Sequence, residues 1–396
     1  MASLKGKTDP RFKKVLDLLE ANIGSGEELG ASLVINIDGD VVVDVYGGYV
    51  DVDRSKPWDK DTIVNVWSST KTVATLALLI LHERGLIDVN ENVAKYWPEF
   101  AANGKESVKV RHLMSHTSGL SGWNRPFSTE DAYDLERSTN LLAEQAPWWE
   151  PGTASGYHAI TMGHLIGEVV RRVTGKSLTQ FVADDIAGPL NADFQIGAKQ
   201  SDWPRITNVT PPPPFPFDLS TMDPESVIVK TFSAPALDAN AANTEGWRKA
   251  EIGAANGHGN ARSLARILST VSLGGTVDGH RLLSSKTIDM IFQEQANNAD
   301  LVLGQPIRFG IGYGIAGGGT EQTVPFLPKG QNRRVAFWGG WGGSINIMDV
   351  DKRVTISYVM NKMGAGTLGS ERAAAYLKLI YDVLGDHSPN ATAKLV

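Results

Sequence analysis

The stretch from Ser68 to Arg84 holds a helical pattern that is apolar on nearly all sides. Its apolar residues include Val73, Leu76 and Ile80, and they leave no continuous polar face to meet water. Gly85 follows at the place where a helix C-cap is expected. Such a helix must be enclosed by other elements. With 396 residues, 42% of them hydrophobic, the chain is long enough and apolar enough to build a large core around it.

Strand patterns occur at both ends of the chain. Residues 32–37 and 41–46 are two β-branched runs joined by Asp38-Gly39-Asp40, which is a hairpin signal. Further strand patterns, whose close spacing indicates antiparallel neighbours, occupy residues 309–315, 334–338, 344–348 and 354–360. The two ends therefore predict one α/β domain to which both contribute.

Helical patterns flank these strands and fill the middle of the chain. They cover residues 9–23, 162–173, 263–271 and 371–383. A proline run over residues 211–216 should lie on the surface as extended chain. We expect a discontinuous α/β domain formed by residues 1–95 and 250–386, an inserted helical and loop-rich domain over 96–249, and a polar tail over 387–396.

Composition argues against several kinds of partner and site. Lys and Arg total 38 and Asp and Glu total 44, so the net charge of −6 gives no positive field for a nucleic-acid backbone. The absence of cysteine excludes disulfides, thiolate nucleophiles and cysteine zinc sites. The longest apolar run, residues 76–81, is far below the roughly 18 residues of a membrane span, and the charged N-terminus lacks a signal-like apolar segment. We expect a cytoplasmic protein without nucleic-acid or membrane partners.

The sharpest chemical signal is Trp67-Ser68-Ser69-Thr70-Lys71, at the entry of the apolar helix. A lysine three positions after a serine lies on the same helical turn, so its amine can reach the hydroxyl. The helix N-terminus also offers backbone N–H groups to an oxyanion. Ser-x-x-Lys alone is weak, because it arises often by chance and Ser68 could equally be a helix N-cap.

Two distant segments add groups that suit acyl transfer. Tyr157 lies in a glycine-containing loop, residues 151–159, just before a helical pattern. The run Trp338-Gly339-Gly340-Trp341-Gly342-Gly343 follows a strand pattern, and its glycines allow a backbone to approach a ligand closely. A nucleophile, a second base and a glycine-rich strand edge together indicate acyl transfer.

These motifs, in this order, resemble the serine β-lactamase and penicillin-binding-protein superfamily. Within it, the chain is most similar to the class C-like branch that contains family VIII carboxylesterases and fungal statin-type acyltransferases. The resemblance covers about residues 30–384 and includes residues 111–120, 256–265 and 357–361. It implies a mainly antiparallel central sheet flanked by helices plus an all-helical domain, with the active site in the cleft between them.

The resemblance also implies a role for each motif residue. Ser68 matches the acylated nucleophile, Lys71 its helical partner and Tyr157 the tyrosine of the second motif. Trp338-Gly339-Gly340 matches the third, substrate-binding motif, and the oxyanion hole would be the backbone N–H groups of Ser68 and Trp341. Free Tyr and Lys are both protonated at neutral pH, so one of them must have a lowered pKa to act as a base. Burial lowers the pKa of a lysine and a nearby cation lowers that of a tyrosine. We therefore expect a coupled pair that takes the Ser68 proton, with either member as the base.

Two departures from the lactamase pattern bear on the substrate. Trp338 stands where lactamases carry a cation, and the third position of the Tyr157-His158-Ala159 motif lacks the lactamase amide. Both changes favour a neutral, apolar ester. We therefore expect a serine carboxylesterase with an acyl-enzyme on Ser68. The first alternative is an acyltransferase with an alcohol acceptor, followed by a β-lactamase, a D-aminopeptidase or a non-catalytic binding relative.

A few other residues are candidates for the site. Trp123 and Trp148 are candidate walls of an apolar pocket, although tryptophans more often pack in a core. His158 could line the pocket or be a satisfied loop histidine. His112 and His116 are four apart but have no evident third ligand, so we expect neither a metal nor another cofactor. The expected partner is a small-molecule ester, bound by a monomer or homodimer.

Overall fold

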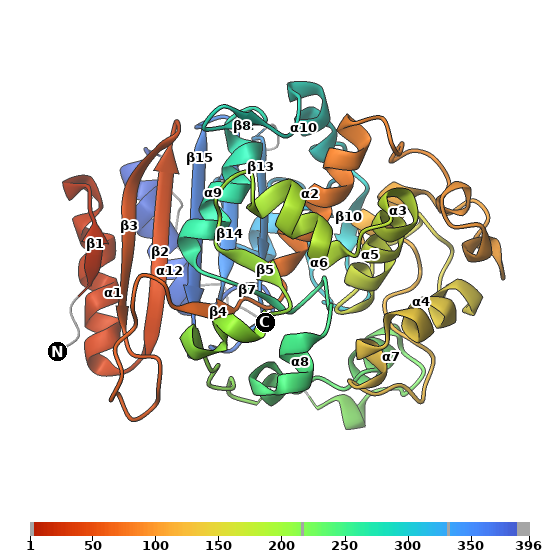
Figure 1. The fold of residues 1–396 in the computed structure, drawn as a ribbon, viewed down its shortest axis with the longest axis horizontal. Coiled ribbons are helices and arrows are strands. Elements are labelled where there is room, and N and C mark those ends of the chain that lie inside the picture. Colours follow the sequence, from red (N-terminus) through yellow and green to blue (C-terminus); the bar gives the residue numbers. More distant parts are fainter. Residues whose placement is uncertain (1–3, 215–217, 331–332, 386–396) are drawn as a thin grey trace.

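A computed structural model describes residues 4–214, 218–330 and 333–385 of the protein (Figure 1). Within these ranges the largest feature is a nine-stranded sheet, in the order β1-β3-β2-β15-β14-β13-β12-β11-β10, in which all neighbours are antiparallel. Its strands are β1 (Lys5–Lys7), β2 (Gly30–Ile37), β3 (Asp40–Gly48), β10 (Ala296–Ala299), β11 (Pro306–Phe309), β12 (Gly314–Ile315), β13 (Val335–Gly339), β14 (Ile345–Asp349) and β15 (Val354–Met360).

The two ends of the chain share this sheet. Strand β2 pairs with β15 from Ala31 opposite Met360 to Ile37 opposite Val354. The predicted hairpin joins β2 to β3, with Asp38 at φ 53° and Gly39 at φ 94°, as a tight two-residue turn requires. The prediction of a mainly antiparallel sheet built from both ends is confirmed.

Helices cover both faces of the sheet, which explains why β13, β14 and β15 are buried along their whole length. In Figure 1, α12 (Glu371–Val383) lies behind the sheet, where it packs against α1 (Lys13–Ser25). In front lie α2 (Thr70–Glu83) and α9 (Ala261–Ser272), and α9 crosses β2, β14 and β15. Residues 70–81 of α2 are all buried, as their apolar pattern predicts.

The remaining helices lie mainly to the right of the sheet in Figure 1, around α2. They are α3 (Val110–Met114), α4 (Leu135–Glu144), α5 (Thr161–Thr174), α6 (Leu178–Phe181), α7 (Val227–Ser233), α8 (Glu245–Lys249), α10 (Ser285–Ile291) and α11 (Thr320–Thr323). Short stretches of other helix types are η1 (Pro10–Phe12), η2 (Val93–Lys95), η3 (Pro98–Ala101), η4 (Asp131–Tyr133), η5 (Val182–Ala187), η6 (Gln200–Arg205), η7 (Leu219–Thr221) and η8 (Ala239–Asn243).

The inserted region is not all helical, contrary to the expectation. It contributes β5 (Phe194–Ile196) and β6 (Ile206–Thr207) to a four-stranded sheet with β4 (Ile63–Asn65) and β7 (Gly257–Gly259). A further pair, β8 (Thr276–Val277) and β9 (His280–Arg281), forms a short hairpin. These strands are two or three residues long, too short to show a clear alternating pattern.

The predicted strand over residues 309–315 is two strands joined by a turn. Gly310 and Gly312 explain the break: a Cβ on Gly310 would meet the Ile291 carbonyl oxygen at 1.9 Å, and Gly312 has φ 92°. Of the proline run, residues 211–214 have no regular structure and are mostly exposed, as predicted, while residues 215–216 lie outside the described residues. The predicted tail over residues 387–396 also lies outside them.

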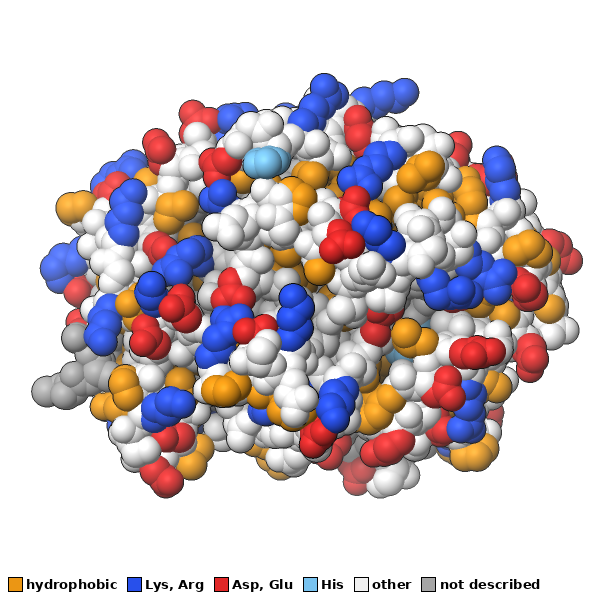
Figure 2. Space-filling view, in the orientation of Figure 1, with side chains coloured by type: hydrophobic (Ala, Val, Ile, Leu, Met, Phe, Trp, Pro, Cys, Tyr) orange, Lys and Arg blue, Asp and Glu red, His pale blue; other side chains and the backbone are white. Residues whose placement is uncertain are grey.

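The surface carries charges of both signs. Figure 2 shows basic and acidic side chains intermixed across one face, without a broad area of a single sign. Within the described ranges, no helix combines the length and the apolarity that a membrane crossing needs.

Candidate active site

Ser68 lies in the turn that leads into α2, one residue before the helix N-cap Ser69. The residue before it, Trp67, has φ 50°, a left-handed conformation that is strained for a bulky side chain. The Trp67 carbonyl accepts hydrogen bonds from both the N–H and the hydroxyl of Thr70, which hold the turn. The local backbone thus presents the Ser68 hydroxyl at the amino end of a helix that is buried from Thr70 to Leu81.

Lys71 is 2% exposed, and its amine has three near neighbours. Its Nζ lies 3.1 Å from the Ser68 Oγ, 2.7 Å from the Ala159 carbonyl oxygen and 3.0 Å from the Ala254 carbonyl oxygen. Burial lowers the pKa of Lys71 well below its usual value. The environment therefore favours the neutral amine, which is the form a general base needs.

Tyr157 completes the group from the loop before α5. Its hydroxyl donates to the Ser68 Oγ at 2.6 Å, and the Lys71 Nζ lies 4.7 Å from the centre of its ring. Burial raises the pKa of Tyr157 to about 12, and the Asp300 carboxylate acts in the same direction, while the hydrogen bond to Ser68 opposes it. The structure thus brings the three sequence-predicted side chains together, with the phenol protonated.

The glycine-rich segment after β13 borders the same site. A Cβ on Gly340 would meet the Val66 carbonyl oxygen at 2.4 Å, so only glycine allows this close approach. The Ser344 hydroxyl donates to that carbonyl at 2.8 Å and lies 2.9 Å from the Ser69 hydroxyl. The turn that contains Trp341 is thus tied to the segment that contains Ser68, as a shared oxyanion hole requires.

Trp338 and Gly339 end β13 beside the tyrosine. The Trp338 ring centre is 5.4 Å from that of Tyr157. The Trp338 indole N–H makes no hydrogen bond of good geometry among the described residues, yet it is close enough to the phenol to lower the pKa of Tyr157 slightly. Gly339 pairs with Ile345, and a Cβ added to it would lie only 3.0 Å from the Gly369 backbone N and the Ser344 carbonyl oxygen. The apolar ring at this position offers a substrate no cation.

His158 has a structural role and does not face a ligand. It is fully buried, with Nε2 2.7 Å from the Ser118 hydroxyl and Nδ1 2.6 Å from the Gly156 carbonyl oxygen. These partners place the proton on Nδ1, so that Nε2 accepts from Ser118. Burial also lowers the pKa of His158 to about 3, so the ring is neutral. Both ring nitrogens are engaged, and the satisfied-histidine interpretation is the one that fits.

A small apolar pocket of about 20 Å³ is lined in part by Trp67, the residue before Ser68. Tryptophan rings form part of its wall: the ring centre of Trp67 is 5.1 Å from that of Trp341 and 5.4 Å from that of Trp247. The Trp247 indole N–H donates to Asn65 Oδ1 at 2.9 Å, which fixes that ring. The other lining residues are Thr129, Ala132, Ile160, Pro235, Ala236, Leu237, Asp238, Ala241 and Ile252.

The two tryptophans expected to line the pocket lie elsewhere. Trp123 is 1% exposed, stacks on Phe127 at 4.1 Å and donates to the Ser138 carbonyl, so it packs in the core. Trp148 packs against the Lys230 amine and is not among the residues that line the pocket. Sequence reasoning missed Trp67 and Trp247. The position of Trp67 next to Ser68 was an available signal, whereas Trp247 had none.

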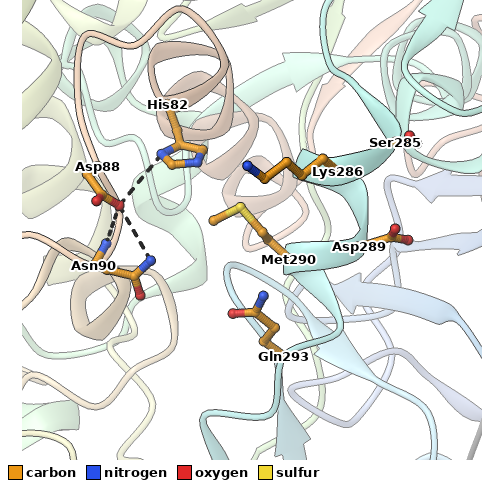
Figure 3. A pocket seen from close by; sticks show the side chains of 8 residues that line it. All are labelled: His82, Asp88, Asn90, Ser285, Lys286, Asp289, Met290 and Gln293. Atoms are coloured by element: carbon orange, nitrogen blue, oxygen red, sulfur yellow. Dashed lines mark hydrogen bonds and ion pairs between the residues drawn. The ribbon is translucent and has the colours of Figure 1, made fainter.

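A second hollow lies at the opposite end of α2 (Figure 3). It has a volume of about 550 Å³, and His82, Asp88, Lys286 and Gln293 are among its lining residues. A helix of 14 residues spans about 20 Å, so this hollow is remote from Ser68. Its side chains do not form a nucleophile and base within contact distance, and it is not the catalytic site.

Comparison with known proteins agrees with the fold and the motifs. The profile described as Beta-lactamase matches residues 15–379. The Esterase/beta-lactamase LipL of Mycobacterium tuberculosis is 31% identical over 379 residues, which cover 90% of this chain and 83% of that protein.

Solved structures give the same result. The crystal structure of a family VIII carboxylesterase matches with a TM-score of 0.88 and 37% identity, covering 96% of this chain and 100% of that one. A penicillin-binding-protein homologue from Caulobacter crescentus matches with a TM-score of 0.86 and 33% identity, also over 96% and 100%. The chain therefore belongs to the beta-lactamase family, and it is a hydrolase of the esterase type with the serine-hydrolase fold of that family.

Proposed function

We propose that this protein is a serine carboxylesterase that hydrolyses neutral, apolar carboxylic esters through an acyl-enzyme on Ser68. The observation that carries the proposal is the convergence on one oxygen: the Ser68 Oγ lies 3.1 Å from the Lys71 Nζ and 2.6 Å from the Tyr157 hydroxyl. A hydroxyl in contact with an amine and a phenol has both a proton acceptor and a proton donor at hand.

Lys71 is the base in this proposal. A neutral amine has two N–H bonds and one lone pair. The carbonyl oxygens of Ala159 and Ala254 accept the two N–H groups, which leaves the lone pair for the Ser68 hydroxyl. Tyr157 is not available as the base at neutral pH, because its raised pKa of about 12 keeps the phenol protonated. Its proton is instead available for the leaving alcohol.

The reaction then balances in two halves. Lys71 takes the Ser68 proton while Oγ bonds to the ester carbonyl carbon, and the oxyanion that forms is held by the backbone N–H groups of Ser68 and Trp341. When the C–O bond to the alcohol breaks, the leaving oxygen takes the Tyr157 proton, and the Lys71 ammonium returns a proton to the phenolate. In the second half, water repeats the sequence and releases the acid. One oxyanion-hole donor is typically worth about 100- to 1000-fold in rate.

The pocket supports a neutral, apolar substrate. Of the described residues that line it, Asp238 alone carries a charge, and that charge is negative. Trp338 adds an aromatic ring where a cation would hold a substrate carboxylate. An anionic substrate would lose its hydration here without gaining a counter-charge, which is costly.

A panel of substrates tests the proposal. The purified protein should hydrolyse p-nitrophenyl esters of short and medium acyl chains and show little turnover of monoanionic esters of equal length. Nitrocefin belongs in the panel because the relative LipL is named both esterase and β-lactamase. Added alcohols test for acyl transfer through the appearance of a new ester. Absence of ester turnover, with nitrocefin hydrolysed, would replace the proposal by a β-lactamase.

A further inference from the structure

The backbone of the loop that carries Tyr157 is held by three successive N–H groups. The Gly156 N–H donates to the His116 carbonyl oxygen at 2.9 Å, and the His158 N–H donates to His116 Nδ1 at 3.0 Å. Between them, the Tyr157 N–H donates to the Asp300 Oδ1 at 2.9 Å. The residue whose phenol touches the serine is thus held directly by a carboxylate 143 positions further along the chain.

Asp300 directly follows β10, and its carboxylate accepts hydrogen bonds from neighbouring backbone N–H groups. The same Oδ1 accepts the N–H groups of Val302 and Leu303, both at 2.9 Å, and the side chain is 1% exposed. The Leu301 N–H in turn donates to the Ser155 carbonyl oxygen at 2.9 Å. Two hydrogen bonds therefore join residues 300–303 to residues 155–157, one at Ser155 and one at Tyr157.

The second carboxylate oxygen of Asp300 is buried and makes no hydrogen bond of good geometry with any described residue. The Ser155 hydroxyl, also without such a bond, lies close enough to lower the pKa of Asp300 against the larger effect of burial, which raises it. A buried carboxylate is costly to keep when a neutral residue could pack in its place. That cost is explained if the oxygen acceptor has a task that an apolar side chain could not perform.

We propose that Asp300 is a positioning residue of the reaction, which holds the Tyr157 backbone so that the phenol stays on the Ser68 Oγ. The inference rests on the proposed function, since it needs Tyr157 to act in the ester reaction. Its effect is geometric: a displacement of about 1 Å of a reacting group can cost about 100-fold in rate. Asp300 itself does not contact the serine or the lysine in any hydrogen bond of the described residues.

Two substitutions separate position from charge. Asp300→Asn keeps an oxygen that can accept the three N–H groups and places its amide beside the Ser155 hydroxyl, so it should retain most of the wild-type kcat. Asp300→Ala removes the acceptor, so kcat should fall about 10- to 100-fold with little change in KM. Rates are expressed per active site, counted from the end point of labelling by a fluorophosphonate.

A matched control distinguishes positioning from general loss of stability. Asp349, the last residue of β14, is also fully buried; it accepts the Lys352 N–H at 3.0 Å and pairs with Arg333, which precedes β13, at 2.9 Å. Asp349→Ala should lower the melting temperature as Asp300→Ala does, but leave kcat per active site unchanged. If both variants lower only the melting temperature, the inference is wrong.

A double-mutant cycle with Tyr157→Phe gives the decisive readout. Once the phenol is gone, Asp300→Ala should have no further effect on the fluorophosphonate labelling rate, whereas it should slow that rate in the wild-type background. Equal slowing in both backgrounds would overturn the inference. Asp300→Ser, whose hydroxyl is too short to reach the Tyr157 N–H, replaces Asp300→Ala if the alanine variant does not fold. A wild-type protein with neither turnover nor labelling would instead contradict the proposed function.

Discussion

The amine of Lys71 lies 3.1 Å from the Ser68 hydroxyl, and none of the ion pairs within the described residues involves it. Its other two partners are carbonyl oxygens, which accept hydrogen bonds but carry no full charge. Burial without a counter-ion disfavours the charged form of an amine and so lowers its pKa. The site is thus arranged to hold the base in its active form before a substrate arrives.

Replacing Lys71 by arginine tests this role of the amine. Lys71→Arg places a permanent cation there, which cannot release its proton in the working pH range. We expect kcat/KM to fall by about 100- to 10,000-fold, the usual worth of a general base. Circular dichroism should show the wild-type fold. Retention of most of the activity would mean that the lysine acts as a fixed charge and that another group is the base.

The pH profile of kcat/KM should reflect the same group. The reaction needs neutral Lys71. The value of kcat/KM should therefore be at its maximum above the pKa of Lys71 and fall as the pH drops through that pKa. Because burial lowers that pKa, the midpoint should lie well below 10.5. Loss of the Tyr157 proton should not limit activity until the pH approaches 12. A midpoint near 10.5 in a stopped-flow pH series would contradict the assignment.

Trp247 should control which esters fit the pocket. Trp247→Ala removes one of the aromatic walls of the pocket that Trp67 and Trp341 also line, so larger apolar groups should gain relative to small ones. Across a series of chain lengths, we expect the ratio of kcat/KM for long over short esters to rise about 10-fold. Trp148→Ala, outside the pocket, should leave this ratio as in the wild type. An unchanged ratio in Trp247→Ala would place the substrate elsewhere.

Protein stability should fall between pH 4.5 and 7 because of Glu28. This carboxyl is buried, with Arg372 at 3.0 Å and the hydroxyl of Tyr358 donating to it, and burial raises its pKa from 4.5 to about 7. The folded protein then holds a proton that the unfolded chain has released, so the free energy of unfolding decreases as the pH rises through this window. Glu28→Gln should flatten this part of the profile in urea titrations. An equal slope in both proteins would contradict the shifted pKa.

Long elements with a clear pattern could be predicted from the sequence. The helix 371–383 and the strand 354–360 occur with the predicted bounds, and α2 is enclosed as its all-apolar pattern demands. The helix nevertheless begins at Thr70, because Ser68 and Ser69 form the preceding turn. The short strands of the small sheet were missed, since their pairing comes from distant partners: β5 and β7, for example, are set by tertiary contacts.

The residues of the site also fall into those that the sequence predicts and those that it does not. Ser68, Lys71 and Tyr157 belong to motifs with local signatures, and the structure brings them together. Trp247 and Asp300 carry no motif, because their places depend on how segments 180 or more positions after Trp67 fold back onto the site. The prediction that Trp123 lines the pocket was wrong, because residue type alone does not say whether a tryptophan faces a pocket or the core.

Mass spectrometry of the intact protein during turnover tests the central claim most directly. Quenched in acid shortly after mixing with p-nitrophenyl butyrate, the wild type should carry one butyryl group, which peptide mapping should locate on Ser68. The adduct should grow by the expected mass for each longer acyl chain and be absent in Ser68→Ala. An adduct on another residue, or full turnover by Ser68→Ala, would contradict the account.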